Sequence, residues 1–286
     1  MTEIADLARR IDDLRDELKA MRPLPGDVLA TIRERYDLEL TYTSNAIEGN
    51  TLTLRETSEV VSHGVTVSGK PLKDHLEAVD HHHALEWMYA FAGTDQPLTA
   101  MVVRNLHQLV LAKSRPDLAG QIALTQRGIT GSVVQFPPAE QVPALMTDFG
   151  DWLRETDSKP ETAFEAHYRL VTLHPFDDGN GRTARLLMNL MLVRGGYRPV
   201  PVGLRDRREY LDALEHAQLT GKREPFQLLM HRRLERTMSE YVGVVRDAVR
   251  LKEERERNGR ESDETRPALT PAQMAHLSQL RSQGRG

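Results

Sequence analysis

Apolar residues recur along most of the chain at alternating spacings of three and four, which is the period of one face of an α-helix. The first such run has the apolar positions Ile4, Leu7, Ile11, Leu14, Leu18 and Met21. Pro23 and Pro25 then end it. We therefore predict an amphipathic N-terminal helix within residues 1–25. Its narrow apolar seam fits two arrangements equally, packing on its own domain or a contact between two copies in a homodimer.

The same period predicts a series of further helices. Apolar positions over 27–47 mark the second one, and Gly49 with Asn50 suits its C-terminal end. Thr53 and Glu56 form a capping-box pattern that begins the next helix. The remaining helices are expected at about 71–92, 99–113, 140–155, 162–173, 181–194, 205–218 and 225–250.

Two stretches depart from this pattern. Residues 114–138 include GQIALTQRGITGSVVQFPP, whose glycines, threonines and short β-branched runs favour a loop or a small β-hairpin. Residues 251–267 are rich in charge, so we expect a frayed or disordered linker followed by one short helix within a tail of 251–286. The sequence thus predicts a mostly α-helical fold with one small β-element.

Composition narrows the classes of function. The 286 residues contain 38 Lys and Arg against 42 Asp and Glu, and this balance gives no reason to expect a nucleic-acid partner. Because there is no cysteine, disulfides, thiolate nucleophiles and thiolate metal sites are excluded. The first residues lack the order of a signal peptide, and no window approaches about 18 consecutive apolar residues. We therefore expect a cytoplasmic protein with no membrane span.

One polar segment, HPFDDGNGRTAR at residues 174–185, separates two apolar helices. Pro175 cannot continue a helix and biases His174 away from helical geometry, so His174 should lie at the end of helix 162–173. Gly179, Asn180 and Gly181 lead directly into the next helix, whose first backbone N–H groups favour a phosphate. The segment therefore predicts an anion site beside a histidine.

The charged residues of the segment extend this prediction. Arg182 and Arg185 lie near a helix N-terminus, which is unfavourable for cations unless an anion faces them. Asp178 can hold Mg²⁺ through one carboxylate while phosphate oxygens and water complete the shell. A neutral His174 can accept the proton of an attacking hydroxyl. Such a set favours phosphoryl-type transfer over a polar turn that only caps a helix.

Residues 174–185 match every specified position of HxFx(D/E)GNGRxxR, and on this motif the chain resembles the Fic (Fic/Doc-like) protein adenylyltransferases over about residues 36–245. The resemblance implies an N-terminal helical region at 26–113 and a helical catalytic core at 114–250 with a β-hairpin flap at about 120–136. It implies transfer of AMP from ATP, with Mg²⁺ or Mn²⁺, to a Ser, Thr or Tyr hydroxyl of a target protein, with self-modification as one case.

The resemblance also assigns roles to single residues of the motif. It implies that His174 is the catalytic base, that Asp178 is the metal ligand, and that Gly179 to Gly181, with Asn180 between them, form the anion hole. Arg182 would support the phosphates and Arg185 would hold the γ-phosphate. In the phosphorylating relative Doc a lysine replaces the second glycine, so Gly181 favours AMP transfer.

A second stretch, TSNAIEGN at residues 43–50, lies far earlier in the chain. Taken alone it is a helix end with Ser44 and Glu48 on one face. Beside the family motif it resembles the inhibitory (S/T)xxxE(G/N) pattern, which implies that Glu48 pairs with Arg185 in place of the γ-phosphate within the inhibitory helix at about 36–50. The chain thus resembles a self-inhibited Fic protein. In some relatives this glutamate aligns a water, so removal of AMP is an alternative activity.

The resemblance gives weaker indications for other residues that could contact the nucleotide. The flap lacks the arginine and the apolar clamp residue of relatives, and Ile129 and Thr130 are its remaining candidate contacts. Tyr210 and Gln218 match nucleotide-side positions of relatives, although a core role suits Tyr210 equally. The irregular flap supports another alternative, a nucleotide-binding regulator without transfer.

Three consecutive histidines, at 81–83, invite a metal interpretation. Consecutive residues on a helix point about 100° apart, so three in a row cannot share one metal ion. We predict a helix surface with one buried ring.

Overall fold

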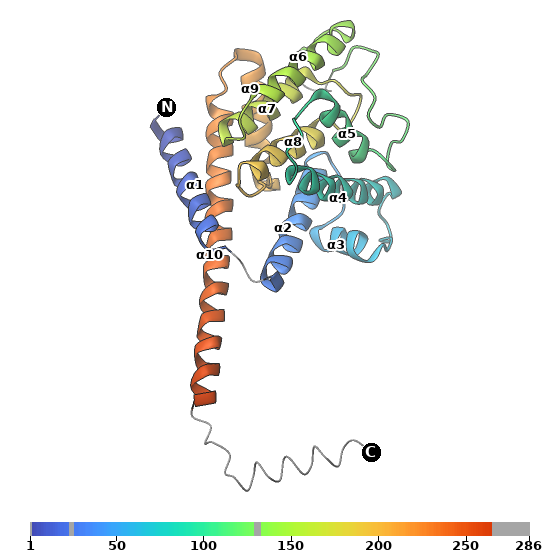
Figure 1. The fold of residues 1–286 in the computed structure, drawn as a ribbon. Helices are drawn as coiled ribbons and strands as arrows, with labels where there is room; N and C mark the ends of the chain where they lie inside the picture. The colour runs from blue at the N-terminus through green and yellow to red at the C-terminus, as the bar shows by residue number, and fades with distance from the viewer. Residues whose placement is uncertain (1, 23–25, 129–132, 265–286) are drawn as a thin grey trace. The chain divides into compact units, whose positions relative to one another are not determined.

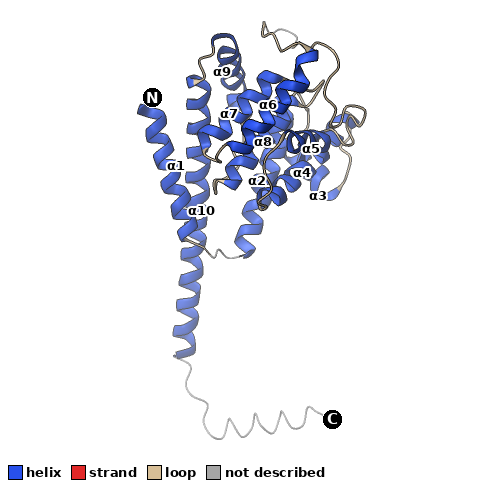
Figure 2. Ribbon diagram, turned by 45° about the horizontal axis from the view of Figure 1, so that its top comes forward, coloured by secondary structure: helices blue, strands red, loops and turns tan. Residues whose placement is uncertain are grey.

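A computed structural model describes residues 2–22, 26–128 and 133–264. In this part of the chain the α-helices are α1 (Thr2–Ala20), α2 (Gly26–Ile47), α3 (Leu54–His63), α4 (Leu72–Ala92), α5 (Ala100–Val110), α6 (Val142–Glu155), α7 (Pro160–Leu173), α8 (Asn180–Arg194), α9 (Arg207–Thr220) and α10 (Glu224–Glu264), with 3₁₀ turns η1 (Ala139–Gln141) and η2 (Leu204–Asp206) (Figure 1). No strand occurs in the described ranges (Figure 2). The mostly helical prediction is confirmed.

Helix α8 lies at the centre of the core and is buried on all sides. It packs against α7, α4 and α5, and it also contacts α2. Its apolar residues Leu187, Leu190 and Met191 are fully buried, and the polar residues of its first turn are buried as well. A helix that is covered all round belongs to the interior of a domain. The motif at 174–185 is therefore held at the centre of the fold.

Helix α1 packs on its own chain. Ile11 belongs to the main core cluster. Around it, Asp12 accepts a hydrogen bond of 2.6 Å from the Tyr197 hydroxyl, and Arg10 pairs with Glu235 of α10 at 3.3 Å. The helix therefore covers part of its own domain, and a contact between two copies stays a prediction.

The residues after α2 fold back against α4. The predicted capping box is present, because the Thr53 side chain accepts from the Glu56 backbone N–H while the Glu56 side chain accepts from that of Thr53. Just before it, Asp74 of α4 accepts hydrogen bonds from the backbone N–H and the hydroxyl of Thr51. The end of α2 is thereby held between α4 and the motif.

The predicted hairpin is not seen in the described residues of segment 114–138. Residues 114–128 and 133–138 form turns and irregular chain. The backbone N–H of Ala123 donates to the carbonyl oxygen of Pro175 at 3.0 Å, so this amide joins the motif loop and not a second strand. Ile129 and Thr130 lie outside the described residues.

Helix α10 is longer than predicted. It continues to Glu264, through most of the charged stretch 251–267, so the prediction of a frayed or disordered linker there is wrong up to Glu264. Glu, Lys and Arg are good helix formers, so high charge without proline does not stop a helix. The chain divides into one compact unit that ends at Val242 and a second that begins at Gly243.

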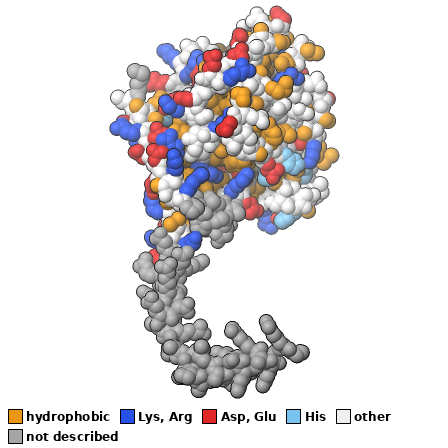
Figure 3. Space-filling model, viewed as in Figure 1, with side chains coloured by type: hydrophobic (Ala, Val, Ile, Leu, Met, Phe, Trp, Pro, Cys, Tyr) orange, Lys and Arg blue, Asp and Glu red, His pale blue; other side chains and the backbone are white. Residues whose placement is uncertain are grey.

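The surface of the protein carries charges of both signs. On the face shown in Figure 3, Lys and Arg side chains alternate with Asp and Glu side chains and do not form one large patch. Across the described residues, no helix combines the length and the apolar character needed to cross a bilayer.

The run of three histidines has one buried ring, as predicted, and the buried histidines of the core make the stability depend on pH. His81 is buried, whereas His83 is exposed. Burial lowers the pKa of His81 well below its usual value, and burial lowers the pKa of His167 on α7 to about 3. In the unfolded chain both titrate near pH 6.5, at about the ordinary histidine pKa.

The unfolded state therefore binds more protons than the folded state once the pH falls below about 6.5. We expect the free energy of unfolding to decrease with falling pH, by up to about 1.4 kcal/mol per pH unit for each of these histidines. Urea denaturation at pH 7 and pH 5 measures the change. The substitution His167→Gln should reduce the pH dependence, and the matched exposed variant His83→Gln should not. Equal pH dependence in both variants would contradict the assignment.

Candidate active site

His174 ends α7 in a conformation that is rare for a side-chain-bearing residue. Its φ is 48°, and it is the only non-glycine residue with positive φ in the described ranges. Its Nδ1 lies 3.3 Å from the carbonyl oxygen of Val171, which can only accept, so Nδ1 carries the proton and Nε2 keeps its lone pair. The ring also stacks on Phe136, with centroids 4.1 Å apart. His174 is thus held in one orientation.

The protonation state of His174 suits a base. Burial lowers its pKa to about 4. The imidazole is therefore neutral near pH 7, and Nε2 can accept a proton.

The loop between α7 and α8 is closed by a side chain of the motif itself. Asn180 accepts a hydrogen bond of 3.0 Å from the backbone N–H of Phe176 and donates one of 2.7 Å to the carbonyl oxygen of the same residue. Both Asn180 and Phe176 are buried. Asn180 therefore shapes the loop, and its amide faces Phe176.

Replacing Asn180 by alanine should destabilise the fold by about 2–3 kcal/mol, because two buried backbone groups of Phe176 lose their partner. The Asn180→Asp variant is the matched control, since its carboxylate can still accept from the Phe176 N–H but cannot donate to the carbonyl. We expect Asn180→Asp to be destabilised too, through the unpaired carbonyl and the added buried charge. Urea denaturation measures both. An alanine variant as stable as wild type would show that Asn180 does not hold the loop.

A histidine outside the motif supports the same loop. Nε2 of His107, on α5, donates to the carbonyl oxygen of Asp178 at 3.0 Å, and Nδ1 accepts from the backbone N–H of Gly120 at 3.0 Å. Its ring stacks on Phe176 with centroids 3.7 Å apart. Burial lowers the pKa of His107 to about 4, in keeping with this neutral tautomer. The sequence gives no sign of this contact, because His107 lies within an ordinary apolar helix pattern.

Asp178 is positioned as a single carboxylate at the start of α8. Its Oδ1 accepts from the Gly179 backbone N–H at 2.6 Å and from Nη2 of Arg182 at 3.0 Å. Its side chain remains 31% exposed, and no described residue donates a hydrogen bond to Oδ2. Within the described ranges no group of three or more His, Asp or Glu side chains could hold a metal ion. A lone carboxylate fits Mg²⁺ that keeps water and takes substrate phosphates as further ligands.

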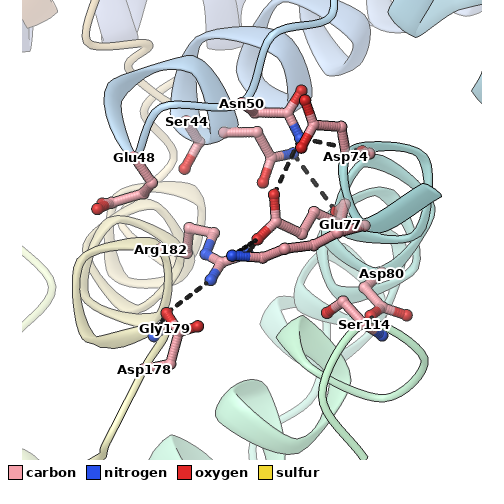
Figure 4. A network of polar contacts seen from close by, with 12 residues as sticks. Ser44, Glu48, Asn50, Asp74, Glu77, Asp80, Ser114, Asp178, Gly179 and Arg182 are labelled. Atoms are coloured by element: carbon pink, nitrogen blue, oxygen red, sulfur yellow. Dashed lines mark hydrogen bonds and ion pairs between the residues drawn. The ribbon is translucent and has the colours of Figure 1, made fainter. Parts of the chain in front are cut away.

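Arg182 is almost completely buried, and two carboxylates flank its guanidinium. Figure 4 shows it between Asp178 and Glu77 of α4, and the distance from Nη1 to Oε1 of Glu77 is 3.3 Å. Glu77 is buried too. The motif assigns only a phosphate role to Arg182, and nothing in the sequence around Glu77 marks it as part of the site. Arg182, the first arginine of the motif, therefore forms ion pairs with protein carboxylates on both sides.

Arg185 binds the end of α2. Its Nη2 donates to Oε1 of Glu48 at 2.8 Å and to the carbonyl oxygen of Ser44 at 2.8 Å, and its Nε donates to the Ser44 hydroxyl at 3.0 Å. Arg185 is buried, whereas the Glu48 side chain is 39% exposed. A Cβ at Gly181 would overlap Oε1 of Glu48. Glu48 and Arg185 thus meet across 137 residues of sequence, beside the N-terminus of α8.

The chain is similar to known proteins along most of its length. A sequence model described as the Fic/DOC family matches residues 97–192. A solved structure of residues 134–508 of Fic-1 from Caenorhabditis elegans matches with a TM-score of 0.77 at 33% identity, covering 86% of this chain and 73% of that one. The chain belongs to the Fic/DOC family. A Fic domain containing signaling protein from Bacteroides thetaiotaomicron also matches, with a TM-score of 0.77 at 29% identity, covering 83% of this chain and 97% of that one.

Curated relatives of this Fic chain are longer than it. A protein adenylyltransferase Fic from Nematostella vectensis is 36% identical over 243 residues, which are 83% of this chain and 56% of the relative. A protein adenylyltransferase fic-1 from Caenorhabditis elegans is 34% identical over 246 residues, or 84% of this chain and 47% of the relative. The chain spans about half the length of the curated relatives it matches.

Two further predicted site residues of the Fic chain lie behind the motif. Tyr210 is fully buried, and its hydroxyl lies 2.7 Å from Nε2 of His167, so it forms part of the core. Gln218 donates from Nε2 to the Val171 carbonyl oxygen and the Thr172 hydroxyl, both at 3.4 Å, at the end of the helix that presents His174. Gln218 is thus near the candidate base, and Tyr210 lies beneath the site, where its hydroxyl also interacts with the Arg185 guanidinium and helps to raise the pKa of that group.

Proposed function

We propose that this chain is a protein adenylyltransferase that transfers AMP from ATP to a Ser, Thr or Tyr hydroxyl of a target protein. The observation that carries the proposal is a neutral His174 whose Nε2 is free to accept a proton, next to the N-terminus of a buried helix. The names of the curated relatives support the same activity.

The geometry suggests a role for each residue in the proposed AMP transfer. The first N–H groups of α8, after Gly179, have no partner within the helix and would bind phosphate oxygens. Nε2 of His174 would accept the proton of the target hydroxyl while its oxygen forms a bond to the α-phosphorus and pyrophosphate departs. Asp178 would hold Mg²⁺, which when bound neutralises phosphate charge. The chain itself would supply the base, the cradle and the orientation.

We further propose that Glu48 inhibits this transfer. Its carboxylate lies beside the N-terminus of α8 and pairs with Arg185, where a γ-phosphate would find the same donors. ATP and Glu48 would then compete for one guanidinium. Because the Glu48 side chain is partly exposed, the competition would be reversible.

Removal of AMP from a modified protein is a second candidate. Glu48 and His174 lie close enough for the negative charge of Glu48 to oppose the lowering of the His174 pKa. A carboxylate between Arg185 and His174 could orient a water molecule for attack on a phosphodiester. This activity would require Glu48, whereas AMP transfer would be opposed by it.

Labelled ATP separates these candidates. The Glu48→Gly variant is incubated with Mg²⁺ and ATP labelled in either the α- or the γ-phosphate, with cell proteins and the chain itself as acceptors. We expect protein label from the α-position only. Label from the γ-position would indicate phosphoryl transfer, and binding of ATP without any label would indicate a nucleotide-binding regulator. Release of AMP from labelled protein by wild type, but not by Glu48→Gly, would support the second candidate.

A further inference from the structure

The guanidinium of Arg182 is shared by two carboxylates from different parts of the fold. Nη2 donates to Oδ1 of Asp178 at 3.0 Å, and Nη1 lies 3.3 Å from Oε1 of Glu77. The Arg182 side chain is only 2% exposed, and Nε and Nη1 have no hydrogen-bond acceptor among the described residues. A buried guanidinium needs a counter-charge, because an unpaired charge is costly in the interior. If one carboxylate is removed, the other becomes the only counter-charge of the two for Arg182.

Glu77 also reaches the turn that carries Glu48. Its Oε2 accepts a hydrogen bond of 3.0 Å from Nδ2 of Asn50, two residues beyond Glu48 (Figure 4). Asn50 further donates to the Asp74 carbonyl oxygen at 3.0 Å and accepts from the Leu52 backbone N–H at 3.1 Å. Asn50 therefore fastens the end of α2 to α4.

A second contact joins α2 to the same residue. Nδ2 of Asn45, one residue after Ser44, donates to the Glu77 carbonyl oxygen at 3.4 Å. The backbone and the carboxylate of Glu77 thus hold α2 on both sides of its last turn. Lys73, one helical turn earlier on α4, adds a cation 3.4 Å from Oε1.

We propose that Glu77 is a positioning residue that couples the Glu48 turn to Arg182 and, through it, to Asp178. This inference rests on the proposed function. One oxygen of Glu77 holds Asn50 and so keeps Glu48 beside Arg185. The other neutralises Arg182, so that Asp178 is not its sole partner and remains available to a metal ion. Both the inhibition by Glu48 and the availability of Asp178 to a metal ion would therefore depend on the buried carboxylate of Glu77.

AMP transfer by double mutants tests the first half. In the wild-type background and at saturating Mg²⁺, Asn50→Ala and Glu77→Gln should each raise transfer about fivefold, the factor for loss of one ordinary hydrogen bond. In the Glu48→Gly background neither should raise it further. Asp80→Asn is the matched control, because Asp80 is another buried carboxylate of α4 that caps the backbone of Lys113 and Ser114. Increases that persist without Glu48, or that Asp80→Asn reproduces, would overturn the coupling to Glu48.

Calorimetry of ATP binding tests the second half without turnover. In a His174→Ala background, Glu77→Gln should raise the Mg²⁺ concentration needed for half-maximal ATP binding about fivefold, because Arg182 then relies on Asp178 alone. Asn50→Ala should leave that concentration unchanged. An unchanged requirement in Glu77→Gln would overturn the link to Asp178. If Glu48→Gly transfers no AMP at all, the proposed function fails, whereas this binding measurement still decides the role of Glu77.

Discussion

Replacing Glu48 by glycine should raise AMP transfer by about 10- to 100-fold, within the usual range of coupling between two ligands of one site. The substitution removes the anion from Arg185 but leaves the two hydrogen bonds from Arg185 to Ser44, so the guanidinium stays in place for a γ-phosphate. The pair joins a buried arginine to a partly exposed glutamate. Its strength should therefore exceed that of a surface ion pair, which is worth about 0–1 kcal/mol.

Two companion variants sharpen this prediction, with initial rates of α-label incorporation as the measurement. Glu48→Gln keeps the size of the side chain and loses its charge, so it should also raise the rate, though less than glycine. Ser44→Ala removes one hydrogen bond to Arg185 and retains the ion pair, so its effect should be about fivefold or less. A Glu48→Gly rate equal to that of wild type would show that Glu48 does not control the site.

Replacing His174 by alanine in the Glu48→Gly background should lower transfer by about 10²- to 10⁴-fold, the usual contribution of a general base. ATP binding should be retained, because His174 is needed for the proton and not for the phosphates. Calorimetry on the same variant measures that binding. Transfer that survives His174→Ala would remove the assigned base.

The pH profile provides an independent check on His174. A histidine with a pKa of about 4 is neutral from pH 8 down to about pH 5, so protonation of the base should not slow transfer in that range. As the pH falls through 4 the imidazole becomes charged and the rate should decline. A decline centred near pH 6.5 would instead indicate a histidine with an ordinary pKa.

The local structure of the motif could be predicted because neighbouring residues determine it. Pro175 disfavours right-handed helical geometry at His174, and α7 ends there, with His174 at a φ of 48°. Thr53 and Glu56 complete each other's hydrogen bonds within one helical turn, so their pattern marks a helix start without further context. In such cases spacing along the sequence carries the physical constraint.

The partners of the motif could not be predicted from spacing. In sequence, Glu77 forms only an ordinary pair with Lys73 one turn away, yet the fold turns it toward Arg182. His107 and Asp178 are 71 residues apart and meet only because α5 packs on α8. Glu48 and Arg185 are even farther apart in the sequence, by 137 residues, and only the resemblance to a family predicts their contact. Tertiary packing determines such partners, and the spacing of residues in a single sequence does not predict that packing.

The bare backbone at Gly181 has an evolutionary consequence. A Cβ there would overlap Oε1 of Glu48 and come within 3.0 Å of Nη1 of Arg185. Any descendant that gained a side chain at this position, and with it a different phosphate cradle, would displace the carboxylate in the same step. Under the proposed inhibition, a lineage that alters its chemistry at position 181 would therefore weaken the Glu48 restraint at the same time.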